Sequence, residues 1–167
     1  MINIDRTYHW YAIYTKSRRE KELERDLIAD GYEAYLPKIS RLRVWSDRKK
    51  WVEMPLFSGY VFVKVSNKEY YTVLQHPAAV KYVGFGGVAA KIPECQLETV
   101  KRILGLNLDM EVRTDNFKKG QVVEISAGPL SGCTGEIISV SSKKKLLLRI
   151  DNIGYSLVVT IPAAYLA

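Results

Sequence analysis

Residues 56–65 form an apolar stretch rich in β-branched side chains, which reads Leu-Phe-Ser-Gly-Tyr-Val-Phe-Val-Lys-Val. Proline precedes it and Ser-Asn follows it, so we predict a strand of a central sheet. Side chains alternate between the two faces of a strand, so the three valines share one face. The other face carries Tyr60, Phe62 and Lys64. Monomeric domains rarely expose such aromatic rings without a partner, so we expect an open face that binds one.

The composition of the chain is that of a globular protein with two domains. Its 167 residues are 47% hydrophobic and 26% charged, and the character of the sequence changes near residues 105–117. No apolar run approaches the roughly 20 residues that span a bilayer. Residues 1–6 lack the basic and apolar regions of a secretory signal. We therefore expect a cytoplasmic monomer that contacts no membrane.

The reactive side chains show no catalytic or metal-binding spacing. Cys95 and Cys133 are far apart in the sequence, and His9 and His76 are equally isolated. No Gly-rich phosphate loop or catalytic triad pattern is present. We expect two ordinary thiols, no metal, no cofactor and no enzymatic activity.

The positive charge is concentrated in the first two thirds of the chain. The formal net charge is +7, and residues 1–108 carry six of these seven excess charges. A basic excess of this kind favours a polyanionic partner near the first domain.

The N-terminal part begins with a strand, a helix and an edge strand. Residues 9–15 alternate as a strand does. We predict a helix over residues 17–30, because Ser17 and Glu20 can form a capping box and Gly31 can take the left-handed conformation after the last turn. Residues 32–37 predict a short edge strand that ends at proline.

A basic excursion follows over residues 38–53. Its alternation predicts two strands joined by a turn at Ser46-Asp47, and six basic residues fall between positions 38 and 50. We expect a projecting basic loop with tryptophans at its base.

The rest of the first domain completes an α/β pattern. After the central strand we predict a helix over residues 68–75, a strand over 80–85, a turn at Gly86-Gly87 and a helix that starts at Pro93 and ends before Gly105. This order of elements indicates a ferredoxin-like α/β sandwich over residues 1–108.

The C-terminal part is purely β. Residues 109–116 lack a clear period and are predicted to be a linker. Strands are predicted over residues 121–125, 135–140, 145–150 and 156–161, with Lys143–Lys145 in a hairpin turn. About 50 residues with four or five strands fit a small SH3-like barrel over residues 117–167, because closure removes exposed edges. The fold class is therefore α+β.

Residues 120–137 resemble a KOW motif. The stretch combines a strand, a Gly-Pro turn, two further glycines and a second strand. Gly128, Gly132 and Gly135 permit sharp turns, and Pro129 fixes one of them. A generic SH3-like hairpin is the alternative.

A KOW domain would also suit a ribosomal protein, so the first domain must indicate the class of protein. Residues 10–14, Glu20-Lys21, Leu36-Pro37, residues 56–63 and residues 80–85 resemble, in this order, the N-terminal (NGN) domain of NusG-like transcription elongation factors. Residues 45–50 resemble the specialised UpxY and RfaH types, which act on surface-polysaccharide operons. Ser58 departs from the pattern, which has proline there.

The resemblance implies that the first domain binds the clamp helices of the largest RNA polymerase subunit. By motif, the residues that line this site are Tyr14, Phe57, Tyr60 and Phe62. The candidates for contact with non-template or upstream DNA are Lys16, Arg18, Arg19, Arg43, Arg48, Lys49 and Lys50. The second polymerase contact of RfaH-type proteins has no counterpart by residue, because residues 70–73 differ from that motif.

The resemblance also implies a partner for the barrel, either a ribosomal small-subunit protein or the termination factor Rho. In RfaH this domain can refold as a helical hairpin, but the β-branched residues and turn glycines here favour a stable barrel. The implied function is suppression of pausing and termination, and it is specific to an operon.

The rival interpretation is an RNA-binding protein. Residues 58–65 resemble the RNA-stacking strand of an RRM, although Ser58, Val61 and Val65 disagree with its pattern.

Overall fold

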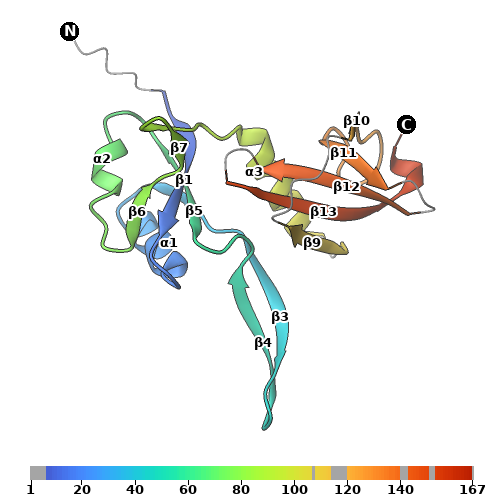
Figure 1. The fold of residues 1–167 in the computed structure, drawn as a ribbon, viewed down its shortest axis with the longest axis horizontal. Coiled ribbons are helices and arrows are strands. Elements are labelled where there is room, and N and C mark those ends of the chain that lie inside the picture. The colour runs from blue at the N-terminus through green and yellow to red at the C-terminus, as the bar shows by residue number, and fades with distance from the viewer. Residues whose placement is uncertain (1–6, 107, 114–119, 140–142, 151–152, 167) are drawn as a thin grey trace. The chain divides into compact units, whose positions relative to one another are not determined.

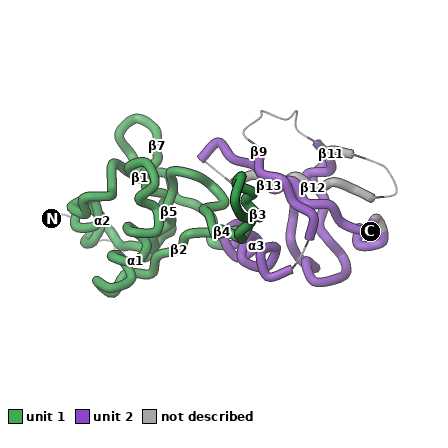
Figure 2. Tube along the Cα trace, turned by 90° about the horizontal axis from the view of Figure 1, so that it is seen from below, with its two compact units in different colours: residues 1–94 green, residues 95–167 purple. Residues whose placement is uncertain are grey.

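The computed structural model describes residues 7–106, 108–113, 120–139, 143–150 and 153–166 (Figure 1). The chain divides into two compact units, a first unit of residues 1–94 and a second unit of residues 95–167 (Figure 2). Residues 95–108, which the sequence assigns to the first domain, are grouped here with the second unit. Which segments fold independently stays a prediction.

The first unit is built on a four-stranded antiparallel sheet. Its strand order is β2-β5-β1-β6, and the strands are β1 (His9–Thr15), β2 (Glu33–Tyr35), β5 (Tyr60–Val65) and β6 (Ala79–Tyr82). β1 pairs with β5 in a register that places Ala12 opposite Phe62 and Tyr14 opposite Tyr60. β2 is an edge strand, as predicted.

Two helices, α1 (Glu20–Ala29) and α2 (Tyr70–Val73), contribute to the core on one face of this sheet. Leu23 and Leu27 of α1 and Val73 of α2 belong to one buried cluster with the valines of β5. The expectation that Val61, Val63 and Val65 face the helices is confirmed. Valine at every second position of β5 places all three valines on the face of the strand that packs against the helices.

The start of α1 differs from the prediction. The helix begins at Glu20, and its first residue is preceded by Arg19 without any side-chain cap. The carboxylate of Glu20 instead accepts a hydrogen bond from the backbone N–H of Gly59, at 2.8 Å. The capping box of Ser17 and Glu20 is therefore wrong, because a distant segment uses this carboxylate. The other end is as predicted, since Gly31 has φ +90.

The central strand is shorter than the apolar stretch that predicts it. β5 starts at Tyr60, and Leu56 and Phe57 lie in the turn before it. Gly59 has φ +87 in this turn, a left-handed conformation that glycine adopts readily. β6 ends at Tyr82, and a small hairpin of β7 (Gly84–Phe85) and β8 (Val88–Ala89) follows, turned at two glycines as expected.

Strands β3 (Lys38–Val44) and β4 (Lys49–Pro55) form a separate two-stranded sheet, which extends away from the four-stranded sheet of its unit (Figure 1). The backbone N–H of Trp45 donates to the carbonyl of Arg48 at 2.8 Å, which closes the turn at Ser46-Asp47. The predicted excursion and its turn are confirmed. Trp45 lies at the tip of the hairpin, and Trp51 lies opposite Leu42, midway along it, so the expectation of tryptophans at the base is wrong.

The second unit contains α3 (Glu94–Leu104) from its second residue onward, and a five-stranded antiparallel sheet. The sheet order is β10-β11-β12-β13-β9. The strands are β9 (Met110–Arg113), β10 (Gln121–Glu124), β11 (Thr134–Ser139), β12 (Lys143–Ile150) and β13 (Tyr155–Pro162), followed by a 3-10 helix, η1 (Ala163–Tyr165). The four strands predicted from residue 121 onward are confirmed, with ends shifted by up to two residues.

Two expectations for this unit are corrected. Residues 110–113 of the predicted linker form β9 and pair with β13, while residues 114–116 lie outside the described residues. Lys143–Lys145 belong to β12 and not to a hairpin turn, because they pair with residues 160–162 of β13. Residues 110–113 mix apolar and charged side chains and Lys143–Lys145 are all charged, so the local preference for a strand is weak and tertiary pairing decides. No described helix is long and apolar enough to cross a membrane.

Candidate functional site

Tyr14 and Tyr60 form a pair on the sheet face opposite to α1 and α2. They are cross-strand partners, and their ring centroids lie 4.8 Å apart with the planes tilted by 41°. The ammonium group of Lys81 lies 5.4 Å from the centroid of the Tyr14 ring. Both tyrosines are half-buried, so part of the surface of each residue is accessible. This arrangement is an aromatic surface with a cation at its edge.

Phe57 and Phe62 lie deeper than the sequence predicts. Their exposed fractions are 1% and 0%, and the two rings meet edge to face with centroids 6.4 Å apart. Phe62 shares its strand face with Tyr60, two residues away. The expectation that this face is open is therefore wrong at Phe62. The half-buried tyrosines are the accessible aromatic groups among the four predicted residues.

The lysine of this face is engaged in ion pairs. The ammonium group of Lys64 lies 3.0 Å from a carboxylate oxygen of Glu94 and 3.9 Å from one of Glu33. It also lies 6.0 Å from the centroid of the Trp10 ring. Lys64 therefore has partners within the chain.

Glu20 fixes the turn that leads into Tyr60. Its carboxylate, in a residue only 7% exposed, accepts from Gly59, whose carbonyl accepts from the backbone N–H of Thr15 at 2.9 Å. The end of β1, the start of α1 and the residue before Tyr60 are thus held together. The sequence gives no sign of this role, because nothing in it links positions 20 and 59.

The first group of predicted nucleic-acid ligands lies in the loop between β1 and α1. Lys16, Arg18 and Arg19 are all exposed. Arg18 has φ +62, a left-handed conformation that is uncommon for a residue other than glycine. The guanidinium of Arg19 pairs with Glu22 at 3.4 Å.

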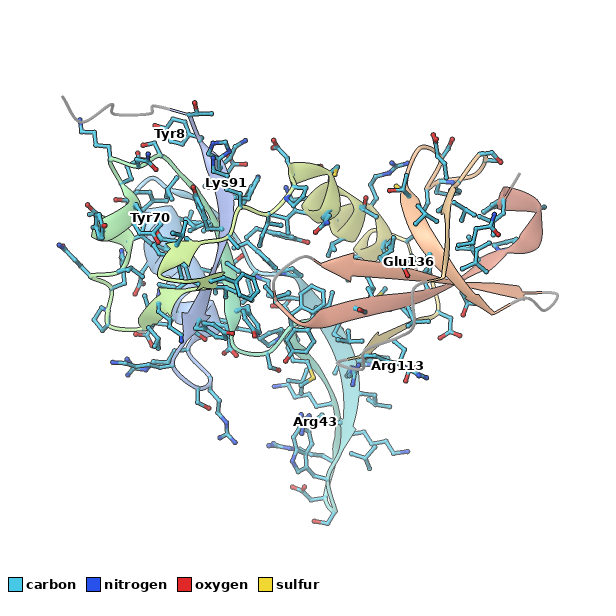
Figure 3. The ribbon with its side chains drawn as sticks, turned by 45° about the horizontal axis from the view of Figure 1, so that its top comes forward. Tyr8, Arg43, Tyr70, Lys91, Arg113 and Glu136 are labelled. Carbon is cyan, nitrogen blue, oxygen red and sulfur yellow. The ribbon has the colours of Figure 1, made fainter. Side chains whose placement is uncertain are left out.

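The second group lies on the β3–β4 hairpin, where Arg43, Arg48, Lys49 and Lys50 are all exposed. Figure 3 shows Arg43 on this projecting element. The register places Arg43 opposite Lys50 and Val44 opposite Lys49, so Lys49 points to the other face of the hairpin. The predicted basic residues therefore occupy two elements, and the hairpin divides its own between two faces.

The glycine-rich turn of the second unit is present, with one difference. Gly128 and Gly132 have φ +78 and +83, whereas Gly135 lies inside β11, opposite Val123. The carbonyl of Pro129 accepts from the guanidinium of Arg102 at 2.6 Å.

Arg102 belongs to α3, and it makes two more contacts with this turn. Its guanidinium donates to the carbonyl of Ser131 at 3.1 Å and to the thiol sulfur of Cys133 at 3.2 Å. Cys133 is buried and Cys95 is exposed, and both are free thiols.

Residues 70–73 contribute to the aromatic core of the first unit. The Tyr70 and Tyr82 rings are stacked at 4.0 Å, and the Tyr82 hydroxyl donates to the Tyr70 carbonyl at 2.8 Å. Burial raises the pKa of Tyr82 above its usual value, and the neighbouring Tyr70 adds to this shift. Tyr70 therefore has a packing role here.

Comparison with known proteins identifies the family. The family model described as "Transcription termination factor nusG" matches residues 8–102, which is more than half of the chain. The chain belongs to the NusG family. The match includes the β1 and β5 strands that carry Tyr14 and Tyr60, as well as the β3–β4 hairpin.

Individual relatives agree with this assignment. The chain is 25% identical to the transcription termination/antitermination protein NusG of Bacillus subtilis over 151 residues, which cover 81% of this chain and 84% of that protein. It is 24% identical to NusG of Borreliella burgdorferi, over 88% of this chain and 91% of that protein.

A solved structure of Thermotoga maritima NusG has a similar fold. It matches with a TM-score of 0.54 at 22% identity and covers 96% of both chains. At this identity the likeness concerns the fold alone, a mixed α/β arrangement with many strands and few helices.

Proposed function

We propose that this NusG-family protein binds RNA polymerase during elongation and suppresses pausing and termination. The observation that carries this proposal is the Tyr14–Tyr60 pair on the sheet face opposite to the helices. Half-buried aromatic rings held by a rigid sheet are typical anchors of protein interfaces, where the central ones contribute about 2 kcal/mol or more each.

The partner of the pair in this proposal is the clamp-helix region of the largest polymerase subunit. Phe57 and Phe62 pack against each other and do not themselves form the contact, because both are buried. Non-template or upstream DNA is held by phosphate contacts of exposed cations, namely Lys16, Arg18, Arg19, Arg43, Arg48 and Lys50. Lys49 is also exposed, but it lies on the other face of the hairpin and contributes less to this contact.

The two parts of the fold have separate roles in this proposal. The first is a ferredoxin-like NGN domain over residues 1–108, and the second is a SH3-like KOW barrel over residues 117–167 that binds a ribosomal small-subunit protein or Rho. The five-stranded antiparallel sheet and the turn at Gly128 support the barrel. The basic hairpin, with its similarity to UpxY and RfaH proteins, supports a role in a specific operon, such as one for surface polysaccharides, in the cytoplasm.

The test is retention of core RNA polymerase by the immobilised full chain. We expect the double variant Tyr14→Ala with Tyr60→Ala to lose retention, because it removes the accessible anchors. Phe85→Ala is the matched control, since Phe85 is an aromatic residue 74% exposed on another hairpin. Full retention by the double variant, with an unchanged melting temperature, would contradict the proposal.

The RNA-binding alternative makes a different prediction for the same variants. An RRM-like sheet needs accessible rings on β5, but Phe62 is fully buried. Tight RNA binding that depends on Tyr60, with no retention of polymerase, would favour that alternative.

A further inference from the structure

We infer that one face of the β3–β4 hairpin binds single-stranded nucleic acid, with Trp45 stacked on an unpaired base and the surrounding cations on the flanking phosphates. The inference deepens the proposed function, on which it rests, because it names the form of nucleic acid that the hairpin contacts. The cationic face consists of Arg41, Arg43, Trp45, Arg48 and Lys50. The apolar face consists of Leu42, Val44 and Trp51, with Lys49 near the tip.

The strand register separates these two faces. Residues directly opposite each other in an antiparallel pair share a face, and the face alternates along each strand. Arg43 lies opposite Lys50, and Arg41 lies opposite Val52. The same alternation, continued to the closing pair of the turn, adds Trp45 and Arg48. Leu42 lies opposite Trp51 on the other face.

The cations of this face are available for a ligand. All of them are exposed, and within the part of the chain that the structure describes no ion pair or hydrogen bond involves the side chains of Arg41, Arg43 or Lys50. Other cations of the same unit, such as Lys38 with Glu24 at 3.0 Å, are paired. The cationic face is therefore an uncompensated positive surface.

The two opposed cations of this face, Arg43 and Lys50, repel each other unless an anion lies between them. Arg43 and Lys50 are directly opposite, and like charges in this position destabilise a strand pair. A two-stranded sheet on its own is already marginal. A phosphate between the two side chains removes the repulsion, so the geometry suits a polyanion.

Trp45 indicates that the polyanion has unpaired bases. The residue is 43% exposed, and the guanidinium carbon of Arg48 lies 5.6 Å from its ring centroid. Aromatic rings beside cations are the stacking platforms of proteins that bind single strands, because an unpaired base offers a free ring face. In a duplex both faces of each base are already stacked. The shared chemistry of DNA and RNA single strands fits this site.

The apolar face supplies matched controls within the same hairpin. Trp51 is 67% exposed, more than Trp45, but points away from the cationic face. Lys49 is next to Lys50 in the sequence, but its side chain lies on the apolar face. Hydrophobicity or net charge alone predicts equal effects at each pair of positions, whereas the inference predicts unequal effects.

The experiment measures binding of the full chain to a labelled 12-nucleotide single strand by fluorescence anisotropy, with DNA, RNA and duplex DNA as separate probes. We expect Trp45→Ala to weaken single-strand binding at least about fivefold and Trp51→Ala to leave it nearly unchanged. Lys50→Ala is expected to weaken it more than Lys49→Ala. A comparison of the DNA and RNA arms shows which single strand is preferred.

A second pair of variants separates stacking from folding of the hairpin. Trp45→Phe keeps an aromatic ring, and Trp45→Leu keeps apolar bulk without one. We expect the first to retain most of the affinity and the second to behave as Trp45→Ala. In the Trp51→Phe variant, whose tryptophans are Trp45 and the buried Trp10, the single strand is expected to quench the tryptophan emission.

Three results would overturn the inference. These are equal losses in Trp45→Ala and Trp51→Ala, equal affinity of Trp45→Phe and Trp45→Leu, or tighter binding of the duplex than of either single strand. Retention of RNA polymerase by Trp45→Ala is a separate measurement. If Trp45→Ala keeps its retention of polymerase but loses single-strand binding, both proposals are supported. The retention of polymerase by the Tyr14 and Tyr60 double variant tests the proposed function alone.

Discussion

The buried carboxylate of Glu20 joins the start of α1 to the turn before Tyr60. One hydrogen bond therefore contributes both to the stability of the first unit and to the position of the aromatic pair. Glu20→Ala removes the acceptor of the Gly59 N–H, and we expect a loss of about 1–3 kcal/mol in the free energy of unfolding. Glu20→Gln keeps an oxygen acceptor and should lose less. Thermal unfolding of the full chain measures both variants. Equal losses would show that the charge of Glu20, and not its acceptor, is what matters.

Two glycines of the turn after β10 differ in what surrounds them. Gly128 and Gly132 both have positive φ, but a Cβ atom at Gly128 would lie 2.5 Å from the Tyr165 ring, while at Gly132 it would meet nothing within 4 Å. We expect Gly132→Ala to cost about 1 kcal/mol for its backbone conformation and Gly128→Ala to cost more. The melting temperatures of the two variants test this order. A smaller loss at Gly128 would mean that the Tyr165 ring moves away easily.

At the scale of elements, the alternating patterns were sufficient to predict most strands. The valines of β5 and the turn at Ser46-Asp47 follow from local periodicity and turn chemistry, which the fold keeps. β9 could not be predicted, because residues 110–113 become a strand only through pairing with β13. The capping box failed for the same reason, since Glu20 satisfies a local pattern and a distant backbone group equally well.

The sequence predicts which strands carry the candidate site, but not how deeply each of its side chains is buried. Alternation placed Tyr60 and Phe62 on one face, yet it carries no information on depth, and only the tyrosine is accessible. The role that we infer for Trp45 does not follow from the sequence either, because the division of the hairpin into two faces requires the register of Arg43 with Lys50.

The hairpin as an element is expected to become more stable when its like-charge pair is removed. Arg43→Thr replaces one of two opposed cations by a residue that favours strands, and we expect a gain of about 0.2–1 kcal/mol. Hydrogen exchange of the hairpin amides should slow by up to about fivefold. Lys49→Thr is the control, because Val44 opposite to it is uncharged. Equal slowing in both variants would attribute the gain to strand propensity and not to relief of repulsion.

At the scale of the whole molecule, the two proposed contacts rest on different physics. The Tyr14–Tyr60 pair offers apolar ring surface, whose burial depends little on salt, whereas the cationic face of the hairpin releases counterions when it meets phosphates. A protein that binds polymerase through the first contact keeps the hairpin close to nucleic acid. Weak single-strand binding then becomes effective, because the second contact is intramolecular within the complex.

Salt therefore separates the two contacts in one preparation. With four cations on phosphates, the logarithm of the single-strand binding constant is expected to fall with the logarithm of salt concentration with a slope of about −3, and this slope should become shallower by about 0.7 in Lys50→Ala. Retention of polymerase should change little over the same salt range. Titrations from about 0.1 to 0.3 M salt, run in parallel with pull-downs, measure both quantities. If retention of polymerase falls as steeply as single-strand binding, its contact is electrostatic, and the tyrosine pair is not its centre.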